Sequence, residues 1–459
     1  MKRKAVAISD RPAAKRPRAD IPDYHATPQI KEDDGSVRWP APTAQIERAR
    51  EIMLECALSG KKTLIVPDKD ADGLSSGAIL RHTLILLGLR ENLIDVHLLS
   101  KGNNVFDDVE RARMLAYYPD YVFVIDQGSR SGPPIIDKPH TGLVIDHHFA
   151  TEADFPKDSD HVSACHSPPV ATSSLLTYLI CEPLHDEVRA KCDWLAVVGA
   201  HGDLGNTLKW EPPFPSMTDT FKKYTKKLLN DIVSLVNAPR RTATYDVISA
   251  WDSLATTEVP SSVLKSPRLL AARQEVNAEV ERCTHAAPKF SADGKIAVFR
   301  IRSEAQVHPV IATRWAGHLQ SKALEIVMVA NEGYVPDKVN FSCRIARCAR
   351  GRETAVDIIQ TLKGYAAMSD PVGGEAESVD IDAEKRPFIE RLGDNFARGH
   401  VQASGGIVGV EEFEELMRIM QVGVKVDKPG GEGKSPAKKK AGVIDAKQKN
   451  TLAGYFAKA

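Results

Sequence analysis

The 459-residue chain lacks the features that stabilise small secreted proteins or anchor proteins in membranes. Its seven cysteines are scattered and form no Cys-x-x-Cys pair, so the sequence indicates neither a zinc-thiolate site nor a disulfide framework. No apolar run reaches the ~18–20 residues of a membrane span, and the amino terminus lacks a signal-peptide core. We therefore expect a reduced intracellular compartment and no membrane partner.

Net charge is also absent, but the charges are unevenly placed along the chain. Residues 1–20 carry seven Lys or Arg against two Asp, and residues 421–459 carry nine Lys against three acidic residues. Basic tails of this kind attract polyanions. With 42% hydrophobic and 27% charged residues overall, the chain has enough apolar content for two folded domains.

Acidic and histidine side chains follow the ends of several apolar segments. The runs at 63–67, 121–125 and 142–145 are typical of buried strands, whereas 74–87 and 188–200 have helical patterns. Ligands bind at the carboxyl ends of strands in open α/β sheets. Carboxylates converge there only if something cationic holds them together. The residues that follow these segments are Asp68, Asp70, Asp72, Asp126, Asp146, His147, His148 and Asp203.

Each cluster taken alone has a simpler explanation. An isolated Asp-His-His triplet is often a solvated turn with a capping Asp, and an Asp-rich loop often binds calcium or stabilises a turn. An EF-hand would need later ligands and a bidentate Glu, but here the chain enters an apolar helix. The presence of four clusters favours a functional site.

In this order, the clusters resemble the motifs of the DHH phosphoesterase superfamily: an Asp-x-Asp-x-Asp-Gly loop, a lone strand-end Asp, Asp-His-His and a later Gly-Asp. The resemblance implies a mostly parallel-sheet α/β domain at 41–205 that binds two divalent metal ions, usually Mn²⁺, with Mg²⁺ as the alternative. Asp68 stands where many relatives have His. The implied metal ligands are Asp68, Asp70, Asp72, the bridging Asp126, His147 and Asp203. The implied catalytic residues are Asp146, which orients its neighbours, and His148, which faces the substrate phosphate.

The residue types lead to the same chemistry without the resemblance. Carboxylates and imidazoles in the absence of thiolate ligands suit manganese or magnesium. Two such ions about 3.5–4 Å apart activate a water molecule and neutralise the leaving oxygen in an in-line displacement at phosphorus. We therefore expect an enzyme that hydrolyses phosphoesters without a covalent intermediate.

A second group of motifs lies near the carboxyl end of the folded region. Residues 339–345 alternate apolar and polar like a half-buried strand, with Arg344 on the polar face. Residues 398–406 resemble the Gly-Gly-His-x-x-Ala-x-Gly signature of the DHH-associated domain of RecJ-type exonucleases and oligonucleotide phosphodiesterases, with Arg398 in place of the first glycine. The substrate-binding residues implied by this resemblance are His400, Arg344, Gly399, Gly405 and Gly406.

These motifs define the expected domain organisation. Helical patterns at 221–236 and about 264–283 indicate a helical connector at 206–288. A smaller α/β DHH-associated domain is expected at 289–422. Disordered tails are expected at 1–40 and 423–446.

Both tails carry motifs that resemble targeting signals. Residues 2–4 and 15–18 have the form of a bipartite nuclear localisation signal, so we expect a nuclear protein. Residues 447–459 are similar to the PIP box that binds the sliding clamp PCNA, although Lys449 stands where Gln is usual. A docking helix for another partner is the alternative. The residues that match the PIP box are Leu452, Tyr455 and Phe456.

Together these features predict a manganese-dependent, RecJ-like exonuclease that releases mononucleotides from single-stranded nucleic acid, with DNA favoured, in replication or repair. Two alternatives stay open. One is a phosphodiesterase of short oligonucleotides or cyclic dinucleotides, which shares the same two domains. The other is a non-catalytic replication scaffold. Retention of the acidic positions argues against the scaffold, and the basic tails favour a long polyanion.

Overall fold

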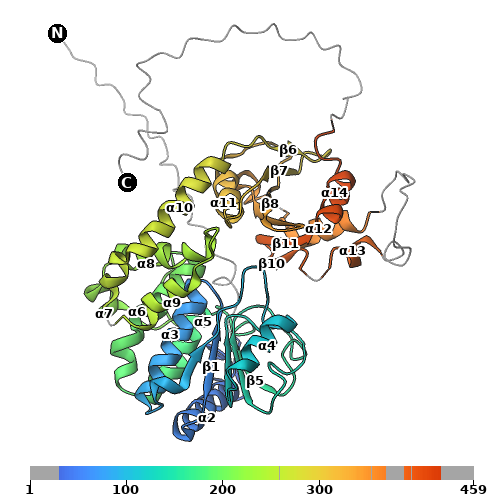
Figure 1. Ribbon diagram of the computed structural model, residues 1–459. Helices are drawn as coiled ribbons and strands as arrows, with labels where there is room; N and C mark the ends of the chain where they lie inside the picture. The colour runs from blue at the N-terminus through green and yellow to red at the C-terminus, as the bar shows by residue number, and fades with distance from the viewer. Residues whose placement is uncertain (1–29, 258, 353, 369–386, 394, 425–459) are drawn as a thin grey trace, which may run out of the picture.

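The structure is a computed structural model that describes residues 30–424 except 258, 353, 369–386 and 394. The nuclear-localisation motif and the PIP-box residues lie outside the described residues. The described chain forms two domains joined by helices, with the second domain above the first in Figure 1. No helix in this part of the chain is both long and apolar enough to cross a membrane.

The first domain contains a parallel sheet of five strands in the order β2-β1-β3-β4-β5. Pro67, Ile125 and Ile145 lie in register at the carboxyl ends of three adjacent strands, β1, β3 and β4. The polar residues that follow these ends are therefore brought to one edge of the sheet. The strands are β1 (Thr63–Pro67), β2 (Ile94–Val96), β3 (Tyr121–Ile125), β4 (Thr141–Asp146) and β5 (Ser159–Ser163).

Apolar side chains bury both faces of this sheet. Ile65 and Phe123 pack into a large core with α2, α3, α5 and α6, whereas Leu64 and Val122 pack on the opposite face with Met114 of α4. Burial on both faces explains why these strands are continuous apolar runs. The helices are α2 (Thr43–Ser59), α3 (Ala71–Leu86), η1 (Glu91–Leu93), α4 (Asp108–Ala116), α5 (Ser173–Cys181), η2 (Glu182–Leu184) and α6 (Glu187–Leu204).

Helices also form the segment between the two sheets. The single helix expected at 221–236 is instead two helices, because Tyr224 is extended and Thr225 starts a new helix by accepting a hydrogen bond from the Leu228 amide. The elements are α7 (Thr218–Lys223), α8 (Lys226–Val236), η3 (Pro239–Arg241), α9 (Val247–Ala255), η4 (Pro260–Lys265) and α10 (Pro267–Cys283).

The second domain has a mixed sheet of six strands in the order β10-β11-β9-β8-β7-β6. Helix α11 packs on one face, and α12 and α14 pack on the other. The prediction that β9 is half-buried is wrong, because both faces are covered and Asn340 and Ser342 are buried. The mixed α/β fold class is as expected.

The elements of this domain are β6 (Lys289–Phe290), β7 (Ile296–Ile301), α11 (His308–His318), β8 (Ile326–Val335), β9 (Lys338–Ile345), η5 (Arg347–Ala349), α12 (Ile358–Ala366), α13 (Phe388–Arg391), β10 (Arg398–His400), β11 (Ala403–Gly409) and α14 (Val410–Ile419).

Candidate metal centre

The imidazole of His147 lies among three carboxylates. Its Nε2 atom is 3.1 Å from Asp203 Oδ2, 3.2 Å from Asp126 Oδ1 and 3.9 Å from Asp72 Oδ2. Asp72 is in the first turn of α3. Asp203 is in the last turn of α6, because that helix continues to Leu204, beyond residue 200, where the helical sequence pattern ends. Side chains from four separate segments thus meet at one point.

This arrangement fits divalent cations. His147 Nε2 is buried and faces the oxygens of Asp126 and Asp203 at 3.2 and 3.1 Å, an arrangement in which an imidazole nitrogen and two carboxylates could share a cation. Asp126 belongs to two of three ligand groups and is placed to bridge two ions. The groups, each with ligand atoms within 4.8 Å of one another, are Asp72, His147 and Asp203; Asp126, His147 and His148; and Asp68, Asp70 and Asp126.

The crowded carboxylates perturb one another's protonation. Burial, and then the charge of Asp203, raises the pKa of Asp72 to about 6. Burial, and then the charge of Asp72, raises the pKa of Asp126 well above its usual range. Burial acts to lower the pKa of His147, but the carboxylates of Asp126 and Asp203 raise it well above its usual value. A bound cation would relieve the repulsion between the carboxylates.

The amino end of α5 holds two of the acidic side chains. Asp72 accepts hydrogen bonds from the amides of Ser173 (2.8 Å) and Ser174 (3.0 Å), and the Ser173 hydroxyl donates to Asp126 Oδ1 (2.8 Å). The positive end of a helix dipole favours such negative groups. A Cβ atom on Gly199 would lie 2.7 Å from Asp72 Oδ1, so α6 needs glycine at this position.

Asp146 is buried and orients the residues around it. Its Oδ1 accepts hydrogen bonds from the His147 amide (2.7 Å) and from His148 Nδ1 (2.8 Å). Its Oδ2 accepts from the Ser129 amide (3.1 Å). Burial opposes the ionised form, but the hydrogen bonds from His148 and Ser129 and the charges of His148 and His147 together outweigh it and lower the pKa of Asp146 to about 2. Burial alone would lower the pKa of His148, but Asp146 raises it to about 9.

Cationic side chains contact the third ligand group. Lys69 Nζ is 3.3 Å from Asp68 Oδ1, and Arg240 Nη2 from η3 is 3.7 Å from Asp70 Oδ2. The other oxygen of Asp70 accepts hydrogen bonds from the amides of Asp72 and Gly73 and thereby caps α3. Asp70 therefore starts the helix that carries Asp72.

The second domain supplies basic residues at its boundary with the connector. Arg344 Nη1 donates to Ser342 Oγ (2.9 Å) and to the carbonyl of Cys343 (2.8 Å). Burial, followed by the charges of Arg344 and Arg241, lowers the pKa of His308 to about 3. Arg241 and His308 were not predicted as site residues, because no motif covers the connector or the start of α11.

The glycines of the second motif are required by packing within the sheet. A Cβ on Gly405 would lie 2.5 Å from the carbonyl oxygen of Phe341, and one on Gly406 would lie 2.8 Å from that of Asn395. This reason was not visible in the motif. Gly399 and His400 lie in β10, and their side-chain surroundings are outside what the structure describes.

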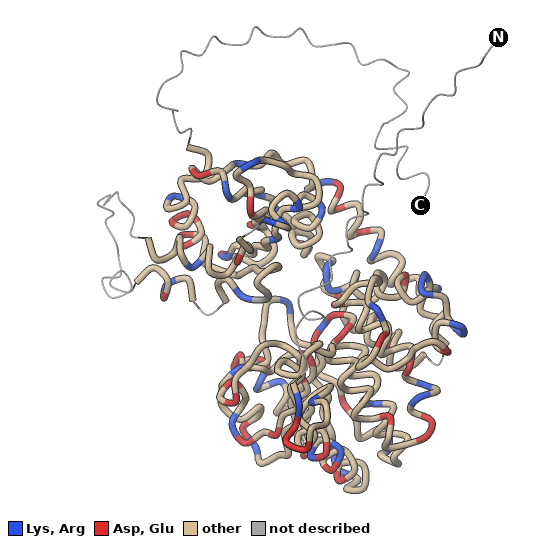
Figure 2. Tube along the Cα trace, turned by 180° about the vertical axis from the view of Figure 1, so that it is seen from behind, with Lys and Arg blue, Asp and Glu red and all other residues tan. Residues whose placement is uncertain are grey.

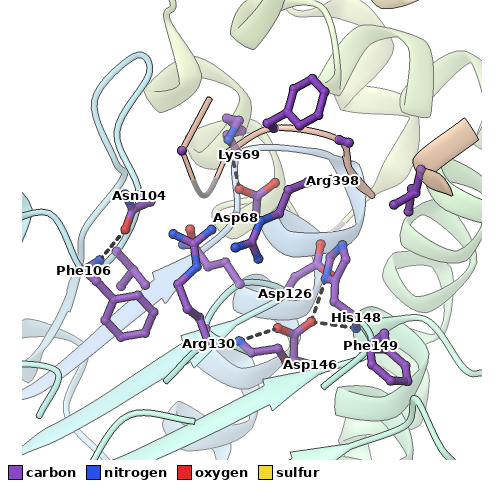
Figure 3. Close-up of a pocket in the computed structure, with 18 of the residues that line it drawn as sticks. Asp68, Lys69, Asn104, Phe106, Asp126, Arg130, Asp146, His148, Phe149 and Arg398 are labelled. Carbon is purple, nitrogen blue, oxygen red and sulfur yellow. Dashed lines mark hydrogen bonds and ion pairs between the residues drawn. The ribbon is translucent and has the colours of Figure 1, made fainter. Parts of the chain in front are cut away.

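A cavity of about 960 Å³ lies between the two domains, next to the acidic cluster. The first domain contributes Asp126, Asp146 and His148, and the second contributes Arg398 at the start of β10. Figure 3 shows the Arg398 side chain reaching into this space. Figure 2 shows further Lys and Arg positions where the two domains face each other.

No family model matches the sequence, and no curated protein matches it either. Solved structures do match its fold. The alignment with a RecJ exonuclease bound to manganese covers 82% of this chain and 93% of the exonuclease chain, at 18% identity and a TM-score of 0.52. The alignment with the DHH domain of a member of the S1p family of ribosomal proteins covers 82% of this chain and 90% of that domain's chain, at 14% identity and a TM-score of 0.58.

A third similar structure is RecJ from Thermus thermophilus in complex with Mn²⁺. That alignment covers 84% of this chain and 55% of the RecJ chain, at 18% identity and a TM-score of 0.52. The chain therefore has the fold of these RecJ and DHH-domain structures.

Proposed function

We propose that this chain is a manganese-dependent phosphodiesterase that degrades single-stranded nucleic acid from an end and releases mononucleotides. The observation that carries the proposal is the convergence of buried His147 Nε2 with the carboxylates of Asp203, Asp126 and Asp72 at 3.1, 3.2 and 3.9 Å. Buried carboxylates that raise one another's pKa are costly without a bound cation, which argues against a scaffold that binds no metal. Solved RecJ structures contain Mn²⁺ or Mg²⁺ and so support a divalent ion, and the imidazole of His147 is the reason for choosing Mn²⁺.

The ligand groups assign roles to individual residues. His147, Asp72 and Asp203 would hold one ion, Asp68 and Asp70 the other, with Asp126 between them. When bound, two such ions would activate a water molecule and neutralise the leaving oxygen. Asp146 positions the His148 ring at the cavity wall.

His148 is suited to contact the substrate phosphate. In the metal-free protein, Asp146 raises the pKa of His148 to about 9, so the imidazolium is charged at neutral pH. A cation at the cavity wall favours the approach of a phosphodiester and stabilises charge on its oxygens. DNA as the preferred strand, a nuclear location and a role in replication or repair are further parts of the proposal, and they rest on the basic tails and the PIP-box-like segment.

Substitutions in the second domain test whether this domain binds the single-stranded nucleic acid while the first domain hydrolyses it. We expect Arg344→Ala and His400→Ala to weaken binding of single-stranded DNA and to reduce its salt dependence, because each removes a phosphate contact. Bound manganese, measured by metal analysis, should stay at the wild-type level. Arg189→Ala, at the exposed start of α6, is the matched control. Unchanged DNA affinity together with loss of manganese would show that the domain roles are wrong.

A further inference from the structure

The interdomain cavity is lined by charged side chains of both signs. The carboxylates in its lining are the metal-site residues Asp68, Asp126 and Asp146. The remaining charged groups are, apart from His148, basic side chains: Lys69, Arg130, Lys363 and Arg398. Once cations bind to the carboxylates, the cavity as a whole favours an anion.

Arg130 and Arg398 reach this cavity from opposite domains. Arg130 follows β3 in the loop after Asp126, and Arg398 begins β10. Figure 3 shows both side chains extending into the space beside Asp68. Two guanidinium groups in such positions can bind phosphate oxygens with several hydrogen bonds each.

An exposed aromatic ring stands beside the catalytic cluster. Phe149 directly follows His148, lines the cavity and is 77% exposed. Its single ring contact among the described residues is an edge contact with His166, at 5.7 Å between centroids. This contact orients the ring and leaves most of its surface open, an arrangement that suits stacking of a nucleobase.

We propose that this cavity is a nucleotide subsite, in which Phe149 stacks on a base next to the reacting phosphate and Arg130 and Arg398 bind that nucleotide's phosphate from the two domains. The inference rests on the proposed function and extends it to the recognition of the substrate. Every base has a π face, so stacking on Phe149 accepts all four bases. Because the two arginines belong to different domains, phosphate binding also fixes the domains around the strand.

The stacking role is tested with two single strands of equal length, one of which carries abasic residues in place of its terminal nucleotides. Binding of each strand to the full chain is measured by fluorescence anisotropy with Ca²⁺ in place of Mn²⁺, and strand integrity is checked on a gel. We expect the wild type to prefer the base-containing strand by roughly 5- to 150-fold, the range that stacking of one base provides. Phe149→Ala should abolish this preference, and Phe149→Trp should retain it.

Phe290→Ala removes another exposed aromatic ring, on β6 and outside the cavity, and should keep the wild-type preference. The variant Arg130→Ala/Arg398→Gly should lower the salt dependence of binding, by about 0.7 in the logarithmic slope for each phosphate that is no longer bound. A Phe149→Ala protein that still prefers the base-containing strand, or an unchanged slope in the double variant, would overturn the subsite. Failure of the proposed function would look different, since the wild type would then hydrolyse no strand even with Mn²⁺.

Discussion

At the scale of single residues, Asp126 is the most constrained member of the acidic cluster. Its backbone lies in the left-handed region, with φ of 62°, which costs a non-glycine residue about 1–2 kcal/mol. Its Oδ1 atom meets both His147 and the Ser173 hydroxyl. A strained backbone at the end of a buried strand, combined with shared contacts, is typical of functional sites. Asn tolerates this conformation better than Ala does, so Asp126→Asn is the more informative substitution.

Protonation of the cluster predicts how the metal-free protein responds to pH. The pKa of Asp72 is raised to about 6, so between pH ~4 and 6 the folded protein holds a proton that the unfolded chain has released. Stability therefore falls as pH rises through this window. The pKa of His148 is raised to about 9, so its stabilising charge is fully present below about 6.5 and is lost as pH rises through 9.

Thermal denaturation in chelator between pH 4 and 9 measures this effect. We expect the part of the slope between pH ~4 and 6 to shrink in Asp72→Asn, because the neutral amide cannot titrate. Added Mn²⁺ should stabilise the wild type more at higher pH, since its ligands must be deprotonated. Identical pH profiles for the metal-free wild type and Asp72→Asn would contradict the assignment.

At the scale of elements, the acidic cluster was predictable because each of its residues follows a buried strand or an apolar helix in the sequence. Their hydrogen-bonding partners were not. Ser173 and Asp126 are 47 positions apart, and nothing in the Ser-Ser start of α5 indicates that the helix points at the acidic cluster. Thr172, which caps α5, marks only where that helix begins. Tertiary packing of α5 against α3 and α6 creates the contact.

Two hydroxyl side chains of α5, at Ser173 and Thr177, provide a test substitution and its control. Ser173→Ala removes the hydroxyl that donates to Asp126, so we expect manganese affinity to fall about 10- to 100-fold, the usual effect of losing a group that orients a metal ligand. Thr177→Val is the control, because the Thr177 hydroxyl is buried in the same helix and has no hydrogen-bond partner among the described residues. Calorimetric titration with Mn²⁺ measures both. Equal losses in the two variants would mean that helix stability, not the Asp126 contact, is responsible.

At the scale of the whole molecule, the motif order in the sequence predicted two α/β domains with a helical segment between them. It could not predict how the domains face each other. That placement depends on contacts from the unassigned connector, such as Arg240 with Asp70 and Arg240 with Gln306. This placement brings Arg130 and Arg398 to the same cavity, and the sequence around either residue does not indicate it.

The carboxyl tail gives a prediction about partners, on residues outside the described structure. Leu452, Tyr455 and Phe456 have the spacing of a PIP box, and Lys449 removes one polar contact of the usual motif. We therefore expect a peptide of residues 443–459 to bind PCNA with about micromolar affinity, near −8 kcal/mol. Calorimetry against a Tyr455→Ala/Phe456→Ala peptide measures this. Absence of binding at hundreds of micromolar would assign the tail to a different partner and leave the catalytic proposal unchanged.

The central claim is that the chain hydrolyses single strands through a metal cluster bridged by Asp126. Its most direct test is an assay of end-labelled single strands, from two residues to several tens of residues long, with Mn²⁺, Mg²⁺ or chelator. We expect the wild type with Mn²⁺ to shorten long strands progressively to mononucleotides, and Asp126→Asn to be inactive while keeping its fold. Activity confined to strands of two to five residues would favour the short-oligonucleotide enzyme. Wild-type turnover by Asp126→Asn, or no hydrolysis of any strand by the wild type with Mn²⁺, would contradict the account.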